Sequence, residues 1–304
     1  MAEEVTHKEA LALVGEAEIA RLRERSDLPA LLHLGAHVGL FGVTGWAVLA
    51  THGDLWLVAS IAHGVVLSFL FTPLHETVHG TAFRTQRFND AVAEVSGFLL
   101  LLPPRYFRFF HFAHHRHTQD LTRDPELSTP RPANLKQYAW YLSGLPYWGA
   151  QIGALVRNAL GALPPAFVPA SAVRKVAMEA RLYLLSYAVV AGISMGLGRS
   201  EIVWLWVIPA LLGQPFLRAY LLAEHAACPL VADMLVNTRT TFTSGFVRFL
   251  AWNMPHHTAH HALPTVPFHR LPELTALLEP QLQSRADGYL EAHRQVRRAW
   301  HLPR

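Results

Sequence analysis

The chain has 304 residues, of which 51% are hydrophobic and 16% are charged. It is therefore richer in apolar residues and poorer in charged residues than an average soluble domain, which favours a membrane protein. The net charge is +4, but the basic residues lie between apolar segments, which argues against nucleic-acid binding. The one cysteine, Cys228, excludes a disulfide framework and a four-cysteine metal site within the chain, and we expect it to be a packing residue.

Residues 1–27 mix Glu, Lys and Arg with Ala and Leu at helical spacing. This pattern predicts an amphipathic cytoplasmic helix, and we expect no cleaved signal segment.

Two pairs of apolar segments predict four transmembrane helices arranged as two hairpins. The first segment is long enough, at about 1.5 Å per residue, to cross roughly 30 Å of hydrocarbon. Arg218 is the one charged residue in the four segments, and it lies near a helix end, where its side chain can reach the interface. The predicted spans are residues 28–50, 55–74, 182–197 and 202–222.

The distribution of basic residues predicts the orientation in the membrane. Of the 26 Lys and Arg residues, only Arg199 lies in a hairpin turn. Because Lys and Arg collect on the cytoplasmic side of short loops, we expect an inner-membrane protein with both termini cytoplasmic. Residues 75–181 and 223–304 then form a cytoplasmic helical cap, and residues 1–304 form a single all-α domain. Two apolar segments in the cap, 91–102 and 142–168, are short or interrupted by Pro, and they predict interfacial pieces.

Nineteen histidines are present, and eight of them fall in three groups. On a helix, residues three and four positions apart share one face, so the rings of each group converge. The groups are HxxxH at His75 and His79, HxxHH at His111, His114 and His115, and HxxHH at His257, His260 and His261.

The remaining histidines carry no repeated spacing. His117 and His256 border the groups, and we place both outside the ligand set. We expect ordinary packing or surface roles for His7, His33, His37, His52, His63, His293 and His301.

Neutral imidazole is a common metal ligand, and a group this rich exceeds what one tetrahedral zinc ion uses. Two metal ions are therefore predicted. Imidazole suits zinc, copper, iron or nickel, so the ligand type alone does not select the metal.

The three histidine groups with two membrane hairpins resemble the membrane fatty acid desaturase and hydroxylase superfamily. The resemblance covers about residues 55–274, and it includes further matching stretches beside the histidines. These stretches are residues 79–83, 116–119, 124–126, 252–255, 263–268 and 271–272.

This resemblance implies two iron ions, O2 as co-substrate and nine histidine ligands. The ninth would be His225, just after the last span, beside the eight grouped histidines. Partners for the rings' other N–H groups would be Glu76, Asp124, Glu126, Glu224 and Asn253. Some acyl-CoA desaturases differ from this chain in two ways. They carry an Asn four residues before the ninth histidine, where this chain has Leu221. Their first histidine group also has one more residue between its two histidines.

The chain has no cysteine set and no Gly-rich turn to carry electrons, so we expect a ferredoxin-like or other external electron carrier. The basic residues Arg294, Arg297 and Arg298 could dock that carrier or anionic lipid headgroups.

A fatty acyl or other lipid chain is the default substrate, and carotenoids or small amphipathic metabolites are alternatives. Desaturation and hydroxylation both stay open. A zinc-dependent membrane hydrolase and a metal or haem transporter are the competing classes.

Overall fold

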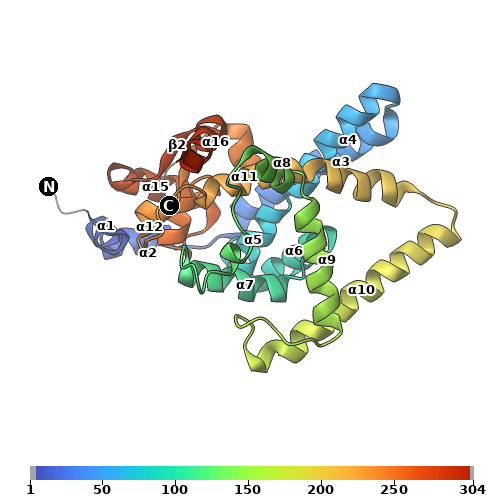
Figure 1. The fold of residues 1–304 in the computed structure, drawn as a ribbon, viewed down its shortest axis with the longest axis horizontal. Helices are drawn as coiled ribbons and strands as arrows, with labels where there is room; N and C mark the ends of the chain where they lie inside the picture. The colour runs from blue at the N-terminus through green and yellow to red at the C-terminus, as the bar shows by residue number, and fades with distance from the viewer. Residues whose placement is uncertain (1–4, 302–304) are drawn as a thin grey trace.

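The computed structural model describes residues 5–301, and helices dominate it (Figure 1). Within that part of the chain, four helices are long and apolar enough to cross a membrane, as predicted. They are Asp27–Ala50, Gly53–His79, Ala170–Gly196 and Val203–His225.

The first two long helices pack side by side. Helix α3 (Asp27–Ala50) is followed by α4 (Gly53–Ser68), and α5 (Phe71–His79) continues in the same direction as α4 after a short irregular turn. Two buried histidines between the helices have partners within the protein, as a low-dielectric environment favours. The hydroxyl of Thr44 lies 2.9 Å from Nδ1 of His63, and Nε2 of His37 lies 3.2 Å from the carbonyl oxygen of Val66.

The second pair is arranged differently. Helix α10 (Val173–Gly196) and the segment formed by the π-helical turn η3 (Val203–Val207) and α11 (Ile208–His225) diverge from their shared turn (Figure 1). Helix α10 packs chiefly against α9 (Leu145–Ala159), while α11 packs chiefly against α4. The prediction of two closed hairpins therefore describes the first pair better than the second.

Helix α10 begins at Val173, nine residues before the predicted span of residues 182–197. Its first turns carry charged residues, so no apolar segment marks this part of the helix in the sequence. The carboxylate of Glu179 accepts hydrogen bonds from the backbone N–H groups of Arg105 and Tyr106, at 3.1 and 3.3 Å. These bonds join α10 to the first turn of α7 (Pro104–His117).

Helices α4 and α11 cross with their backbones in contact. A Cβ atom added at Gly64 would lie 2.8 Å from the backbone N of Gly213, and one added at Gly213 would lie 2.7 Å from Oγ of Ser68 and overlap the carbonyl of Gly64. Only glycine permits this approach, which is typical of tight crossings between membrane helices.

The N-terminal segment departs from the prediction of one helix. It forms two short helices, α1 (His7–Val14) and α2 (Glu16–Leu22), because Gly15 adopts φ 88° and ends the first of them. Residues 1–4 of the predicted helix lie outside the described part of the chain.

The rest of the predicted cap is built from short elements. The middle segment holds α6 (Gln86–Leu99), α7, the 3-10 turn η1 (Pro125–Ser128), α8 (Leu135–Leu142), α9 and η2 (Ala170–Ala172). The C-terminal segment holds α12 (Met234–Asn237), β1 (Thr240–Phe242), α13 (Gly245–Leu250), α14 (His257–Ala262), η4 (Phe268–Arg270), α15 (Leu271–Leu278), η5 (Glu279–Gln281), β2 (Arg285–Asp287), α16 (Tyr289–Arg298) and η6 (Ala299–His301).

The two strands are an exception to the all-α prediction. They pair in parallel, with Thr241 opposite Ala286. Three-residue strands carry too little pattern to be recognised in a sequence.

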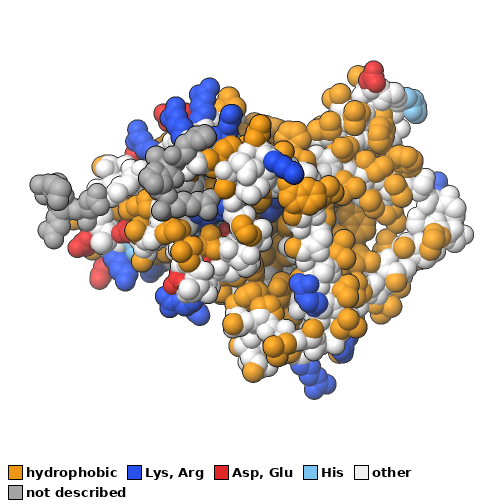
Figure 2. All heavy atoms as spheres, in the orientation of Figure 1, with side chains coloured by type: hydrophobic (Ala, Val, Ile, Leu, Met, Phe, Trp, Pro, Cys, Tyr) orange, Lys and Arg blue, Asp and Glu red, His pale blue; other side chains and the backbone are white. Residues whose placement is uncertain are grey.

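Charged side chains are unevenly distributed over the surface. Figure 2 shows them gathered over the end formed by α1, α2, α15 and α16, while hydrophobic side chains dominate the surface of α3, α4 and α10. Exposed apolar residues on those helices include Trp46, Leu57 and Ile193. Such a surface is stable in a bilayer and unfavourable in water. The fold is thus that of an integral membrane protein with a polar end.

Candidate metal centre

Four helices bring the nine predicted histidines to one place at the polar end of the long helices. Helix α5 carries the first group, α7 the second and α14 the third, and α11 ends at His225. All nine rings lie within one continuous cluster, in which each ring is near at least one other.

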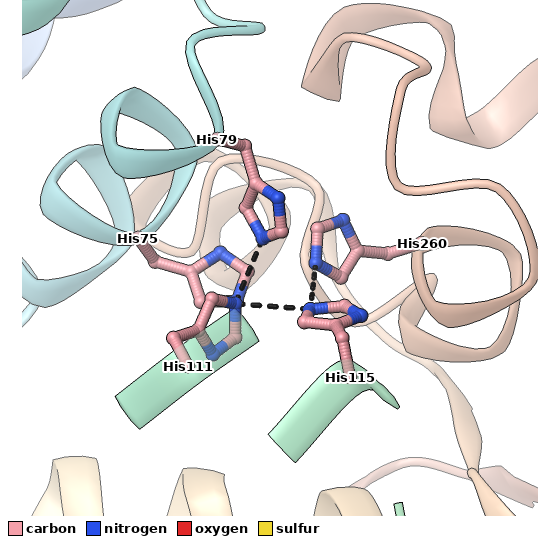
Figure 3. Close-up of side chains that lie close together, drawn as sticks. All are labelled: His75, His79, His111, His115 and His260. Carbon is pink, nitrogen blue, oxygen red and sulfur yellow. Dashed lines mark hydrogen bonds between the residues drawn. The ribbon is translucent and has the colours of Figure 1, made fainter. Parts of the chain in front are cut away.

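Five of these histidines form a first subgroup (Figure 3). Their ligand nitrogens all lie within 4.8 Å of one another. The Nε2 atoms of His79 and His111 are 2.8 Å apart, and Nε2 of His115 lies 3.0 Å from that of His111 and 3.1 Å from that of His260. The ring of His75 completes the set, with its centroid 4.2 Å from that of His111.

A second subgroup lies directly beside the first. It contains His114, His225 and His261, again with ligand nitrogens within 4.8 Å of one another. The Nε2 atom of His225 is 3.2 Å from that of His114 and 3.1 Å from that of His257, so His257 joins this subgroup as a fourth member. The rings of His115 and His261 stack at 4.1 Å and link the two subgroups.

These nitrogen–nitrogen distances fit metal ligation. At a metal–imidazole distance of about 2.1 Å, two ligands at right angles on one ion have nitrogens about 3 Å apart. The alternative of direct hydrogen bonds fails for His114 and His225. Nδ1 of His114 faces Asp124 at 2.9 Å and Nδ1 of His225 faces the carbonyl oxygen of Asn237 at 3.3 Å, so each Nδ1 is the protonated nitrogen. When both rings are neutral, two Nε2 lone pairs then face each other at 3.2 Å, an arrangement that a metal ion between them would stabilise.

Four of the five proposed partners are carboxylates that lie near the rings, and Glu76, Asp124 and Glu224 are buried. Glu76 is fully buried, and its Oε1 lies 3.5 Å from Nδ1 of His75 and 3.7 Å from Nδ1 of His260. Glu224 approaches Nδ1 of His257 at 3.4 Å. Glu126, which is more exposed, approaches Nδ1 of His114 at 3.7 Å beside Asp124. Such partners orient a ligating ring and fix which nitrogen carries the proton.

Asn253 is the exception among the proposed partners. It adopts φ 57°, and its side-chain amide donates to the carbonyl oxygen of Phe268 at 3.2 Å. The structure therefore gives it a place in the turn before α14, where it holds η4, and does not bring it against a ring.

Two further residues that contact the rings were not predicted. The hydroxyl of Thr118 lies 3.2 Å from Nδ1 of His261, and the backbone carbonyl of Asn237 faces His225. Thr118 lies three residues after His115, the last member of the second histidine group, so its position along the chain pointed to the site. The backbone carbonyl of Asn237 gave no such signal in the sequence, because every residue has a backbone carbonyl.

Burial keeps most of these rings neutral. It is the main cause that lowers the pKa of His111, His115, His257, His260 and His261 well below the usual value for histidine. At His114 burial acts in the same direction, but the charge of Glu126 and the hydrogen bond with Asp124 outweigh it and raise the pKa. Neutral imidazoles are the form that binds metal.

The histidines outside the nine take separate roles. His33 and His37 pack around Trp252, and His63 lies between α3 and η3. His7 contacts Asp233, and Tyr138 contacts His293. His256 is buried next to the third group, but neither of the two metal-binding subgroups includes it or His117. The side chain of His301 lies outside the described residues.

A cavity of about 360 Å³ opens onto both subgroups. Its inner wall includes His75, His111, His114, His225 and His257. Aromatic rings from α5 and α7, among them Phe71, Phe107 and Phe110, form one side. This size and this mixture of apolar walls with a few polar groups are typical of a small-molecule site.

Comparisons with known proteins agree with this geometry. Residues 56–292 match the family model described as fatty acid desaturase. The chain is also similar to the sn-1 acyl-lipid omega-3 desaturase (ferredoxin) of Synechocystis sp. (strain ATCC 27184 / PCC 6803 / Kazusa). The two are 23% identical over 279 residues, and the alignment covers 85% of this chain and 77% of that protein.

Proposed function

The chain belongs to the fatty acid desaturase family and is an oxidoreductase, and on that premise we propose that it oxidises an unactivated C–H bond of a lipid chain with O2 at two iron ions. One observation carries the proposal. Nine buried or half-buried imidazoles converge in two adjoining subgroups beside a partly apolar cavity. A hydrolytic zinc site uses about three protein ligands and leaves no purpose for the rest.

We assign the two irons to the two subgroups. The first would be held by His75, His79, His111, His115 and His260, and the second by His114, His225, His257 and His261. Bound iron would supply the two-electron activation of O2 that an unactivated C–H bond requires. Both subgroups leave room for O2, because neither has six histidine ligands.

The balance of the reaction sets what else is needed. In desaturation, O2 takes two hydrogen atoms from adjacent carbons, two electrons from a donor and two protons from water, and it leaves as two water molecules. In hydroxylation the same donor electrons and protons yield one water, and the second oxygen atom stays on the carbon. Desaturation is our first choice because of the family, and hydroxylation is the alternative.

The residues around the histidines have defined tasks in this scheme. Asp124 holds Nδ1–H of His114 and Glu224 lies 3.4 Å from Nδ1 of His257, which favours the tautomer whose Nε2 lone pair points into the site. The aromatic wall of the cavity holds an alkyl chain against the histidines and excludes water. Exclusion of water protects the activated oxygen from side reactions.

The electrons are proposed to come from a ferredoxin-like carrier. The relative from Synechocystis carries ferredoxin in its name, and a small acidic carrier would suit a basic surface. Arg294, Arg297 and Arg298 on α16 form one such surface, although Arg294 and Arg298 also lie near Glu291. The histidine cluster and the carrier surface are proposed to be cytoplasmic, with both termini, in an inner membrane.

Reconstitution tests the proposal. Purified, iron-loaded protein in lipid nanodiscs receives substrate lipid, NADPH, a ferredoxin and its reductase under 18O2, and product is read by mass spectrometry. We expect about two irons per chain and a product that depends on both O2 and the carrier. An unlabelled product two hydrogens lighter indicates desaturation, and a product with one heavy oxygen indicates hydroxylation.

The matched variants lie on one helix. His114→Ala should lose iron and activity, whereas His117→Ala, three residues further along α7 and outside both subgroups, should keep both. Full activity of the His114→Ala protein, or turnover without O2 and reductant, would refute the proposal.

A further inference from the structure

The cavity beside the histidines contains more positive charge than an apolar substrate needs. Three arginines line it, namely Arg131, Arg157 and Arg218. In the part of the chain from residue 5 to residue 301, none of the three forms an ion pair or a side-chain hydrogen bond. Arginine without a partner in a half-buried position is costly, because its charge is partly removed from water.

Arg218 shows this most clearly. Its Nε atom is buried and has no hydrogen-bond partner, and its guanidinium lies over the ring of Tyr147 at 4.2 Å. The aromatic face fixes the plane of the guanidinium through a cation–π interaction and leaves its N–H edge free. A planar group held in this way is suited to bind a carboxylate or a phosphate through two parallel hydrogen bonds.

Among the described residues, no ion pair joins the acidic residues of the cavity to these arginines, although the charge of Glu126 acts on Arg131 and that of Arg218 acts on Glu224. Glu126 and Glu224 line the same cavity, but each approaches a histidine ring, at 3.7 Å from His114 and 3.4 Å from His257. The carboxylates therefore serve the metal centre. The positive charge of the arginines remains available to a ligand.

We propose that the substrate is an amphiphile with an anionic end, a carboxylate or a phosphate, and that Arg218 and Arg131 bind this end inside the cavity while the aromatic wall holds the alkyl part. Arg157 lies on the exposed side of α9 and would attract the anion to the entrance. The inference rests on the proposed function in taking this cavity as the substrate site. It separates this chain from an enzyme for uncharged hydrocarbons or carotenoids, which would leave all three arginines unpaired.

The spacing along α11 adds a consequence for the position of attack. Arg218 precedes His225 by seven residues on the same helix, a separation of about 10 Å along the axis. An anion bound at Arg218 would therefore set the distance between the anionic end of the substrate and the carbon that reacts.

Binding can be measured without turnover. The protein in zwitterionic nanodiscs is loaded with a fluorescent dodecanoic acid labelled at its methyl end. Dodecanoate, dodecyl phosphate or methyl dodecanoate is then added to displace this probe, and the concentration of each competitor is expressed as its mole fraction in the bilayer. We expect at least one anion to displace the probe at a concentration about tenfold lower than the ester, as a charge-assisted pair would give. The stronger of the two anions identifies a carboxylate or a phosphate as the natural group.

The variants locate the effect. Arg218→Gln and Arg131→Gln should each reduce the preference for the anion at least threefold and leave the affinity for the ester, corrected for the weaker binding of the anionic probe, unchanged, which also reports a folded cavity. Arg218→Lys should retain part of the preference. Arg199→Gln, in the exposed turn after α10, is the matched control and should behave as the unaltered chain.

Equal displacement by acid, phosphate and ester, or a preference that survives both Gln variants, would overturn the inference. These outcomes are separate from those for the proposed function. Anion binding without any oxidised product under reductant and O2 would leave the inference standing and remove the proposed function. Oxidation of the ester with no preference for an anion would do the reverse.

Discussion

The contact between Gly64 and Gly213 determines how far apart two parts of the metal centre lie. Helix α4 leads into α5 with His75 and His79, and α11 ends at His225. We predict that Gly213→Ala disturbs the site although residue 213 lies 12 positions before His225. The added methyl group would overlap the carbonyl of Gly64 and lie 2.7 Å from Oγ of Ser68.

The size of the effect follows from these distances. Ordinary contacts of a Cβ atom begin at about 3.4 Å. Rotation of the Ser68 side chain can restore that distance, but the backbone carbonyl of Gly64 overlaps the added Cβ and is cleared only by moving one helix away from the other. Metal–ligand distances tolerate only about 0.2 Å. The helices therefore cannot separate enough to accept the methyl group and still keep His225 at its ligating distance. We expect overpacking to cost about 1–3 kcal/mol of stability.

The assay is iron content by mass spectrometry together with thermal unfolding. Gly213→Ala should lose a large part of the iron in the second subgroup and unfold at a lower temperature. Gly39→Ala in the middle of α3 is the control, since an added Cβ there meets nothing within 4 Å. Normal iron content and normal melting of the Gly213→Ala protein would show that the close crossing does not set the geometry of the site.

Three other predictions follow from the same structure. Asp124→Asn removes the charge that faces Nδ1 of His114 at 2.9 Å, and competition with a chelator should show that the affinity for iron falls by about 10- to 100-fold. Asp120→Asn, on an exposed turn, is the control, and equal affinities of the two variants would contradict the role of Asp124. Removal of iron should lower the melting temperature, because a metal present at about 100 times its Kd stabilises the folded state by about 2.7 kcal/mol; an unchanged melting temperature would mean that the nine rings hold no ion. In whole cells, an impermeant thiol reagent should label cysteine placed at Gly53 or Ser200, in the turns of the two helix pairs, and not at Thr122 or Ser284; labelling at Thr122 from outside would reverse the proposed orientation.

The sequence was sufficient to predict the features that depend on local pattern. The four long helices follow from apolar segments, and the convergence of His111, His114 and His115 follows from their helical spacing. The candidate ninth histidine, His225, came from family resemblance and from its place just after a span. In the structure it lies between His114 and His257, although no spacing within the chain required this.

What the sequence could not predict depends on long-range contacts or on charge. The predicted span excludes the first turns of α10 because they carry Arg174, Lys175 and Glu179, and Glu179 is satisfied by hydrogen bonds from the first turn of α7. The divergence of α10 from α11 results from packing of α11 on α4 through two glycines that resemble any others in the sequence. Asn253 was assigned to the metal centre by proximity along the chain, whereas its left-handed backbone directs its amide to Phe268.

The short helix α14 also bears on the order in which the molecule assembles during synthesis. It spans six residues, His257–Ala262, yet carries three of the nine histidines. A helix of this length has no stability of its own. It is held by contacts such as the hydrogen bond from Thr258 to the carbonyl oxygen of Thr238, at 2.8 Å.

The ribosome must therefore have released nearly the whole chain before the third histidine group has a partner. Until then, His75 to His225 present an incomplete set of ligands at the membrane surface, open to any divalent ion. Correct metal binding is thus expected to be a late event that completes the folded structure. The supply of iron in the cell would then govern how long newly made chains remain exposed to binding of a wrong metal and to proteolysis.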